Sequence, residues 1–312
     1  MSVSEVTSSG DPEEIEDALQ RAGIEYKLTI AGALKVRLTR TELANLTLLS
    51  SRESRARAAY VKFAPHRVFV SFVMPAVRSF VWAGVRVEQG DVVFHSQGEQ
   101  SHQRTMGACH WAFISQTPEH LAACSRALTG RELVPPRTGR VLRLSRSLGG
   151  SLCQLHADAC RLAETKTELV QRSEVVHALE QNLIHALINC LVAGEYCRPV
   201  LARQRGLEIM RQFEQLLSTT PSRLPEAPEL CEALGVSELT LRRYCLEFLG
   251  MGPTRYLHFR RLMMVRATIR GADPTLDDVP EIAKRHGFLQ YKRFLAEYQF
   301  VFREAPSIPN AK

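Results

Sequence analysis

The segments PELCEALG (residues 228–235) and VPEIAKRHG (residues 279–287) follow one plan. A helix-turn-helix needs a small residue where its two helices cross closely, and Cys231 and Ala283 supply one in each segment. Four residues later the turn requires a positive φ, which the glycine that ends each segment adopts without steric penalty. The two segments therefore share the local chemistry of a helix followed by a tight turn.

Each segment leads into a stretch with the apolar spacing of a second helix, at residues 238–249 and 289–300. Ser237 precedes the first of these and can cap it, because its oxygen can accept a backbone N–H. The positions expected to return to the core are Leu241, Tyr244, Phe248, Phe294, Tyr298 and Val301. The sequence predicts two helix-turn-helix units, at residues 228–249 and 277–300.

The two turn glycines, Gly235 and Gly287, lie 52 residues apart (287 − 235). A single pattern of this kind arises often by chance, whereas a repeat is far more specific. Between the units, residues from Pro253 to Gly271 predict one helix of ~17 residues, about 25 Å long at 1.5 Å per residue. Such a spacer suits two recognition helices in successive major grooves, whose centres are ~34 Å apart.

The C-terminal ~100 residues resemble the AraC/XylS family of bacterial transcription regulators. The points of match are LCEALGVS (230–237), LGMGPTRYL (249–257), RRL (260–262), IA (282–283), GF (287–288), RF (293–294) and PS (306–307). The resemblance implies double-stranded promoter DNA and RNA polymerase as partners. It also implies activation of transcription from sites near a promoter.

Positions carried over from this resemblance give the expected DNA-contacting residues. They are Leu239, Arg242, Arg243, Gln290, Tyr291, Lys292, Arg293 and Ala296. Arg242 or Arg243 can bind guanine bidentately, Gln290 can read adenine, and Leu239 or Tyr291 can contact a thymine methyl. Four arginines are candidates for phosphate contacts or for internal ion pairs: Arg255, Arg260, Arg261 and Arg266.

Three positions depart from the family pattern. Cys231 replaces the usual alanine and is small enough to be tolerated. Arg303 stands where the family commonly has glycine, so we expect a different final turn. Pro280 begins a helix of the second unit, where its missing N–H needs no partner.

The N-terminal part has a strand-like pattern from Lys27 to about Ser115, after a lead at residues 1–20 that we expect to be poorly ordered. Segments rich in Val, Phe and Trp within this region include 33–38, 66–74, 80–87, 92–95 and 109–115. Short strands separated by turn residues predict an antiparallel β-barrel or sandwich. The fold class is therefore α+β multidomain, with a β-rich N-terminal domain followed by helices and an all-α double helix-turn-helix domain.

Helical patterns follow the predicted barrel, at about residues 151–164, 173–192 and 200–217. Ser151 is expected to cap the first, and the wide apolar stripe of the second predicts burial on more than one side, including against a second subunit. We expect a regulatory and dimerisation domain over residues 21–205, β-rich to ~130. A helix and linker at 206–222 and the DNA-binding domain at 223–312 complete the chain.

The stretch GDVVFHSQGEQSH (residues 90–102) resembles part of the cupin-like sensor barrels that often precede this DNA-binding domain. In relatives such a barrel binds a small-molecule effector or forms a homodimer. His95, His102 and His110 lack the spacing of cupin metal ligands, so hydrogen-bonded histidines are the favoured interpretation. Trp82 and Trp111 are expected in the core more often than in a ligand pocket.

Composition and charge limit the class of protein. The net charge of +7 makes acidic partners plausible. No stretch approaches the ~18–20 uncharged apolar residues of a membrane helix, so we expect no membrane partner. The N-terminus has no signal-peptide pattern, which indicates a cytoplasmic protein. No Cys-x-x-Cys pair occurs, and reduced thiols are expected.

We expect a regulator that is not an enzyme and has no cofactor or metal. Two alternatives remain open. One is a metal-dependent cupin-type enzyme fused to a DNA-binding module. The other is a regulator whose N-terminal domain is only a protein-interaction platform.

Overall fold

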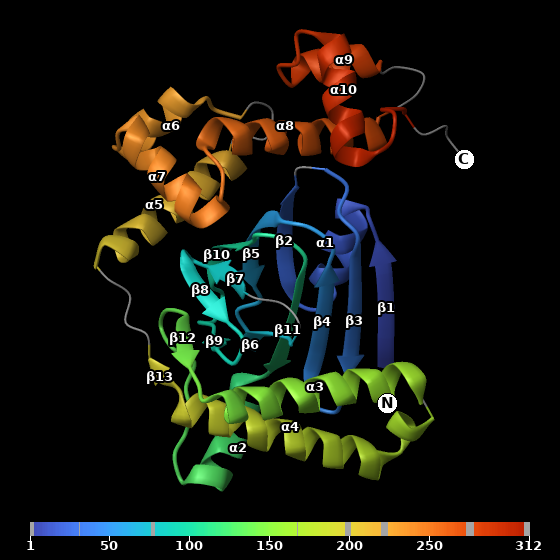
Figure 1. Ribbon diagram of the computed structural model, residues 1–312, viewed down its shortest axis with the longest axis vertical. Helices are drawn as coiled ribbons and strands as arrows, with labels where there is room; N and C mark the ends of the chain where they lie inside the picture. Colours follow the sequence, from blue (N-terminus) through green and yellow to red (C-terminus); the bar gives the residue numbers. More distant parts are fainter. Residues whose placement is uncertain are drawn as a thin grey trace.

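The computed structural model describes residues 3–30, 32–75, 79–166, 168–196, 201–219, 224–272 and 278–308. A β-rich part with two sheets occupies the N-terminal half of the chain, and a group of helices lies across one end of it (Figure 1). This arrangement confirms the α+β class and the two kinds of domain that the sequence predicts.

Both sheets are antiparallel. The first sheet contains, in spatial order, β1 (Val3–Ser9), β3 (Val36–Glu42), β4 (Thr47–Glu53), β11 (Cys109–Gln116), β6 (Val68–Val73), β9 (Val92–Phe94), β12 (Arg140–Arg143) and β13 (Glu195–Tyr196). The second contains β2 (Ile24–Ile30), β5 (Arg57–Phe63), β10 (Gln100–Thr105), β7 (Ser79–Trp82) and β8 (Val85–Glu88).

Aromatic side chains fill the space between the sheets. Phe63, Phe69, Trp82, Trp111 and Phe113 are each at most 4% exposed. The ring centroids of Phe63 and Phe69 are 4.6 Å apart, and those of Phe69 and Phe113 are 5.5 Å apart. The two tryptophans are therefore core residues, as the sequence analysis favoured.

The expectation of a poorly ordered lead at residues 1–20 is wrong. β1 pairs along its length with β3, and α1 (Pro12–Gln20) buries Ile15, Ala18 and Leu19. Asp11 caps α1 by accepting from the Glu13 N–H at 3.0 Å. The polar residues of β1 misled the prediction because an edge strand does not need two apolar faces.

The strand predictions are only partly correct. Residues 80–87, predicted as one strand, form the hairpin β7–β8, which turns at Ala83 (φ 51°) and Gly84 (φ 73°). β2, β4 and β5 fall largely within the predicted strand-like region but were not located individually, and each pairs over seven residues with a neighbour. β4 (TLLSSRE) and β5 (RAAYVKF) lack a regular alternation of polar and apolar residues, which is the usual signal of a half-buried strand.

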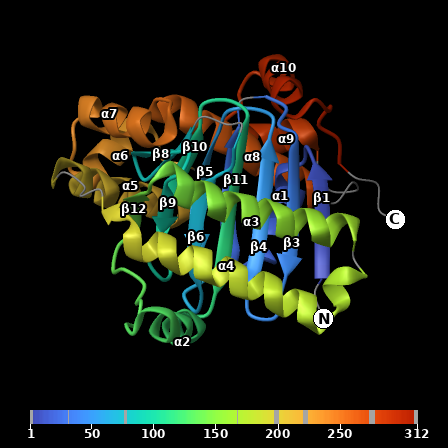
Figure 2. The same ribbon diagram turned by 60° about the horizontal axis from the view of Figure 1, so that its bottom comes forward.

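Helices α3 (Arg146–Thr165) and α4 (Ser173–Ala193) cover the outer face of the first sheet, with α2 (Pro118–Thr129) beside them and a short 3₁₀ turn, Leu169–Gln171, between α3 and α4 (Figure 2). α3 begins one and a half turns earlier than predicted, because Ser145 is its cap and Ser151 lies inside it. α5 (Leu201–Thr219) follows. Of the predicted linker, residues 220–222 lie outside the described residues.

By length and composition alone, α4 could cross a membrane, and it is the one such helix in the described part of the chain. Its apolar residues have another explanation. Leu183, Ile184, Leu187 and Ile188 are at most 1% exposed and pack with α3 and the first sheet. A core helix of this kind passes the same compositional test as a membrane helix.

The C-terminal helices are α6 (Ala227–Leu234), α7 (Glu238–Leu249), α8 (Pro253–Arg270), α9 (Val279–Arg285) and α10 (Tyr291–Phe302). They contact the β-rich part through α7, which packs against β10, and through α8, which packs against β2 and lies across the ends of the sheets (Figure 1). One hydrophobic cluster continues from the interior of the sandwich through α1 to Leu262 and Val265 of α8. Arg266 of α8 donates to Asp11 at 2.8 Å across the same contact.

Two positions with left-handed backbone allow a reciprocal test of this fold. Gly235 (φ 61°) has free space around it, so Gly235→Ala is expected to lower the free energy of unfolding by about 1 kcal/mol through backbone strain alone. Arg303 (φ 61°) already has this strained backbone conformation. Arg303→Gly is therefore expected to raise the free energy of unfolding by up to about 1 kcal/mol. Urea unfolding of both variants measures the pair. Two shifts of the same sign would contradict the assigned backbone.

Candidate nucleic-acid interface

The first helix-turn-helix consists of α6 and α7. Gly235 ends α6 in the left-handed region, and the Val236 N–H donates to the Cys231 carbonyl at 3.0 Å to close the turn. Ser237 caps α7 by accepting from the Thr240 N–H at 3.2 Å, as predicted. The small Cys231 side chain thus lies at the crossing of the two helices, where the sequence placed it.

The second unit has the same construction, but its recognition helix begins and ends two residues later than expected. Gly287 has a φ of 88°, and the Phe288 N–H donates to the Ala283 carbonyl at 3.0 Å. α10 begins at Tyr291, so Leu289 and Gln290 precede it and Gln290 occupies its N-cap position. The expectation that these two residues lie within the helix is wrong, since no side-chain cap holds the chain helical before Tyr291.

The predicted contact residues of α7 lie on its free face. Leu239 is 78% exposed, and Arg242 and Arg243 are both exposed. The opposite face of α7 is buried: Leu241 and Phe248 are at most 1% exposed and pack in the core of the unit. The Arg243 guanidinium lies 5.0 Å from the centroid of the Tyr244 ring, which steadies its position.

The predicted DNA-contacting residues of the second unit differ in their exposure and in their contacts with other side chains. Gln290, Lys292 and Ala296 are exposed. Tyr291 is half-buried and stacks on Phe294, with ring centroids 5.9 Å apart.

Arg293 is exposed, but its Nε donates to Glu297 at 2.9 Å, and Glu297 also pairs with His258 at 3.2 Å. Lys292 is therefore the freer cation of this helix.

The four arginines of α8 divide into two pairs. Arg260 faces the buried carboxylate of Glu214 at 3.6 Å. Arg266 pairs with Asp11 and with Glu304, both at 2.8 Å. These two belong to internal ion pairs. Arg255 and Arg261 remain as candidates for phosphate contacts, the first exposed and the second half-buried.

A groove of about 800 Å³ runs along the free face of the first unit. It lies between α7 and the start of α8, and Leu239, Arg242 and Arg255 line it. In the second unit Leu289, which lies two residues after Gly287 and precedes α10, is 84% exposed. Leu289 was not among the predicted contact residues; its signal is an apolar side chain directly after the Gly-Phe of the turn, where no core position is needed.

The three histidines considered for a metal are separate and hydrogen-bonded. His95 contacts Ser71 at 2.7 Å, His102 contacts Glu214 at 3.0 Å, and His110 contacts Ser50 at 2.8 Å. Within the described ranges, no group of three or more His, Cys, Asp or Glu side chains is placed to hold a metal ion.

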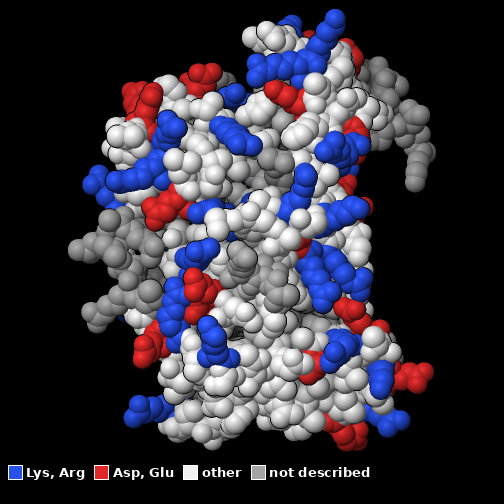
Figure 3. Space-filling model, in the orientation of Figure 1, with Lys and Arg blue, Asp and Glu red and all other residues white. Residues whose placement is uncertain are grey.

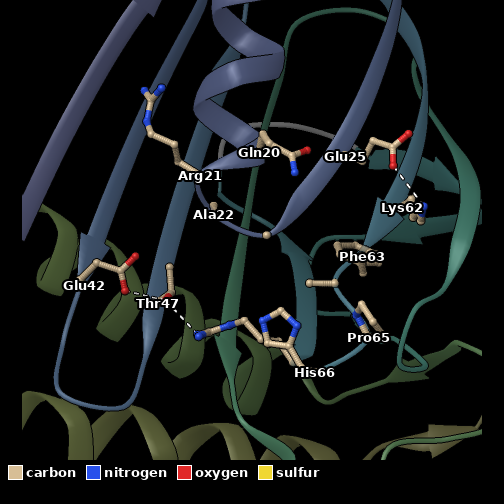
Figure 4. A pocket seen from close by; sticks show the side chains of 13 residues that line it. Gln20, Arg21, Ala22, Glu25, Glu42, Thr47, Lys62, Phe63, Pro65 and His66 are labelled. Carbon is tan, nitrogen blue, oxygen red and sulfur yellow. Dashed lines mark hydrogen bonds and ion pairs between the residues drawn. The ribbon is translucent and has the colours of Figure 1, made fainter.

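A polar cavity of about 550 Å³ opens beside the turn after α1 (Figure 4). Two of its cations are in ion pairs: Lys62 pairs with Glu25 of the lining at 3.2 Å, and Arg21 pairs with Glu5 outside the lining at 2.7 Å. Arg67 donates to Thr47 at 2.9 Å. The cavity therefore presents little unpaired charge to a ligand.

Comparison with known proteins gives three results for this chain. A family described as a helix-turn-helix domain matches residues 230–308. The probable thc operon regulatory protein of Rhodococcus erythropolis is 37% identical over 79 residues, 25% of this chain and 24% of that protein. The chain thus aligns with about a quarter of the length of this relative.

Two solved structures are similar over most of the chain. The AraC-like transcriptional activator CuxR has a TM-score of 0.42 and 15% identity, covering 85% of this chain and 96% of that one. ToxT from Vibrio cholerae O395 has a TM-score of 0.30 and 9% identity, covering 84% and 96%.

Both TM-scores are below 0.5, so the family assignment depends on residues 230–308. The family match is thus to a helix-turn-helix domain at residues 230–308, and the relative that is 37% identical there is named as a probable operon regulatory protein.

Proposed function

We propose that the protein is a sequence-specific DNA-binding transcription regulator. The observation that supports this most is the pair of helix-turn-helix units, each with a buried inner face and an exposed polar and basic outer face. α8, with 18 residues and a length of about 27 Å, joins them. That length suits insertion of α7 and α10 into successive major grooves.

The exposed side chains suggest how bases are read. Arg242 and Arg243 carry the guanidinium forks that bind guanine O6 and N7, and Leu239 offers an apolar contact for a thymine methyl. In the second unit, Gln290 suits adenine and Lys292 a guanine or a phosphate. Promoter DNA, RNA polymerase and a cytoplasmic location follow as part of the proposal, as does activation of transcription.

The experiment that tests this function is selection of bound fragments from randomised duplex DNA with the full-length protein. We expect enrichment of a site with two conserved segments about one helical turn apart. Salt-sensitive binding without sequence preference would contradict the proposal, because contacts to phosphates alone carry no sequence information.

We also propose that α4 forms a homodimer interface. Between residues 177 and 192 its exposed face has no Lys, Arg, Asp or Glu, and the exposed residues are His177, Ala178, Gln181, Asn182, His185 and Val192. Depletion of charge is typical of the centre of an interface. Glu180 points inward, where it accepts from Asn45 at 2.5 Å.

The dimer proposal predicts that Gln181→Glu with His185→Glu converts the protein to a monomer, because four like charges would then face one another across the two-fold axis. Light scattering after size-exclusion chromatography measures the mass. Ala123→Glu with Ala127→Glu on the exposed face of α2 adds the same charge and is the control. A dimer that survives the α4 substitutions but not the α2 ones would contradict this assignment.

For the N-terminal domain, the packed aromatic interior supports a platform for dimerisation, or an effector site outside the sandwich. The rings of Phe63, Trp82 and His95 are in contact, with centroids 4.3 Å apart for Phe63–His95 and 4.5 Å for Trp82–His95. A ligand between the sheets would have to displace them. We favour a regulator over the enzyme alternative, because residues 230–308 match a helix-turn-helix domain family and a probable operon regulatory protein.

A further inference from the structure

Three side chains form a row across neighbouring strands on the outer face of the first sheet. Arg37 of β3 pairs directly with Arg52 of β4, and Arg52 pairs with His110 of β11. The next residues on the same face, Thr39 and Ser50, form a second, polar row. Lys and Arg side chains gather over this side of the sheet, above α3 (Figure 3).

Two arginines directly opposite one another destabilise a sheet, so their charges need an acceptor. Glu164 of α3 accepts from Arg37 at 2.9 Å and from Thr39 at 2.5 Å. Arg52 is exposed and has neither an ion pair nor a hydrogen-bonded acceptor among the residues that the structure describes. Its guanidinium therefore keeps its five donors free beside a second cation.

These side chains line a pocket of about 450 Å³ between the sheet and α3. The other lining residues are Thr39, Ser50, Met74, Ala157, Cys160, Arg161 and Glu164. The Ser50 hydroxyl contacts His110 Nε2 at 2.8 Å. Burial, with the nearby charge of Arg52, lowers the pKa of His110 to about 4, so this ring is a neutral hydrogen-bonding group near pH 7.

We propose that this pocket binds a small organic anion that carries a terminal phosphate or carboxylate. Arg52 would hold the anionic group bidentately, with Arg37 as the second cation and Ser50 as a hydrogen-bonding neighbour. Met74, Ala157 and Cys160 give an apolar wall for the carbon skeleton. The ligand would bridge the first sheet and α3, and its use as an effector depends on the proposed regulatory function.

Two probes and one matched pair of variants test the site. Isothermal titration calorimetry with phenyl phosphate and with benzoate separates a phosphate ligand from a carboxylate ligand, and saturable binding of either supports the proposal. Arg52→Gln is expected to weaken binding by about tenfold or more, since it removes a charge-assisted bidentate contact. Arg55→Gln, three residues away in an exposed turn outside the pocket, is the control and is expected to bind as the wild type does.

Without a probe, Arg52→Gln is expected to raise the melting temperature, because it relieves repulsion with Arg37. Three results would overturn the proposal: no saturable binding of either probe to the wild type, equal weakening by Arg55→Gln, or a fall in the melting temperature of Arg52→Gln with unchanged binding. DNA binding by Arg52→Gln is expected to equal that of the wild type. Its loss would assign the arginine row to a nucleic-acid surface instead, whereas failure of probe binding alone leaves the proposed DNA-binding function intact.

Discussion

Replacing Arg242 and Arg243 together with alanine is expected to weaken binding to the selected DNA site by between roughly thirtyfold and ten-thousandfold. Each bidentate arginine–guanine contact contributes about 1–3 kcal/mol of discrimination, and two such losses give about 2–6 kcal/mol. Both side chains are exposed on α7, and their removal leaves the buried face of the helix unchanged. Fluorescence anisotropy at a fixed salt concentration measures the affinity.

The control for this variant is Arg126→Ala with Arg131→Ala, which makes the same change in net charge in and just after α2, at the opposite end of the molecule (Figure 1). We expect the control to retain specific binding. The α7 variant is expected to lose far more affinity for the selected site than for random DNA. Equal losses on both DNAs would mean that these arginines contact phosphates only, and that bases are read elsewhere.

The C-terminal domain was largely predictable because its signals are local. A small residue, a glycine four positions later and a capping serine fix a helix-turn-helix within a few residues of chain, and Gly235 and Ser237 take those roles in the structure. The fates of Arg260 and Arg266 were not predictable. Their acidic partners include Glu214 and Asp11, and Asp11 lies 255 positions away from Arg266 in the sequence.

The N-terminal domain was predicted as a class and not in detail. β1 (VSEVTSS) was missed because its residues are mostly polar, although an edge strand with one solvated face tolerates such a composition. The row of Arg37, Arg52 and His110 could not be predicted from the sequence either, because the strand register decides which residues lie opposite one another.

The contact between the two domains contains a buried carboxylate that no local pattern revealed. Glu214 of α5 is 0% exposed, and it accepts from His102 of β10 at 3.0 Å. The Tyr256 hydroxyl of α8 also donates to Glu214, and Arg260 lies 3.6 Å away. One carboxylate therefore joins the second sheet, the helix that leads to the DNA-binding domain and the helix that spaces its two units.

Burial alone would raise the pKa of Glu214, but the charge of Arg260 and the hydrogen bonds from His102 and Tyr256 outweigh it and lower the pKa to about 2. A carboxyl whose folded pKa lies below its ordinary value of 4.5 stabilises the fold above pH ~4.5. That contribution, about 3 kcal/mol, is lost as the pH falls from ~4.5 towards 2. The contact between the domains is thus expected to weaken in acid.

Glu214→Gln is therefore expected to lower the free energy of unfolding by about 3–5 kcal/mol at pH 7, because it leaves the Arg260 charge without its buried partner. Urea unfolding followed by circular dichroism at pH 7 and pH 3 measures this, and the difference from wild type is expected to shrink at the lower pH. Glu208→Gln, on the exposed face of the same helix and paired with Arg211 at 2.6 Å, is expected to change stability by less than about 1 kcal/mol. Equal effects of the two substitutions, or a difference that does not depend on pH, would show that Glu214 does not hold the domains together through its charge.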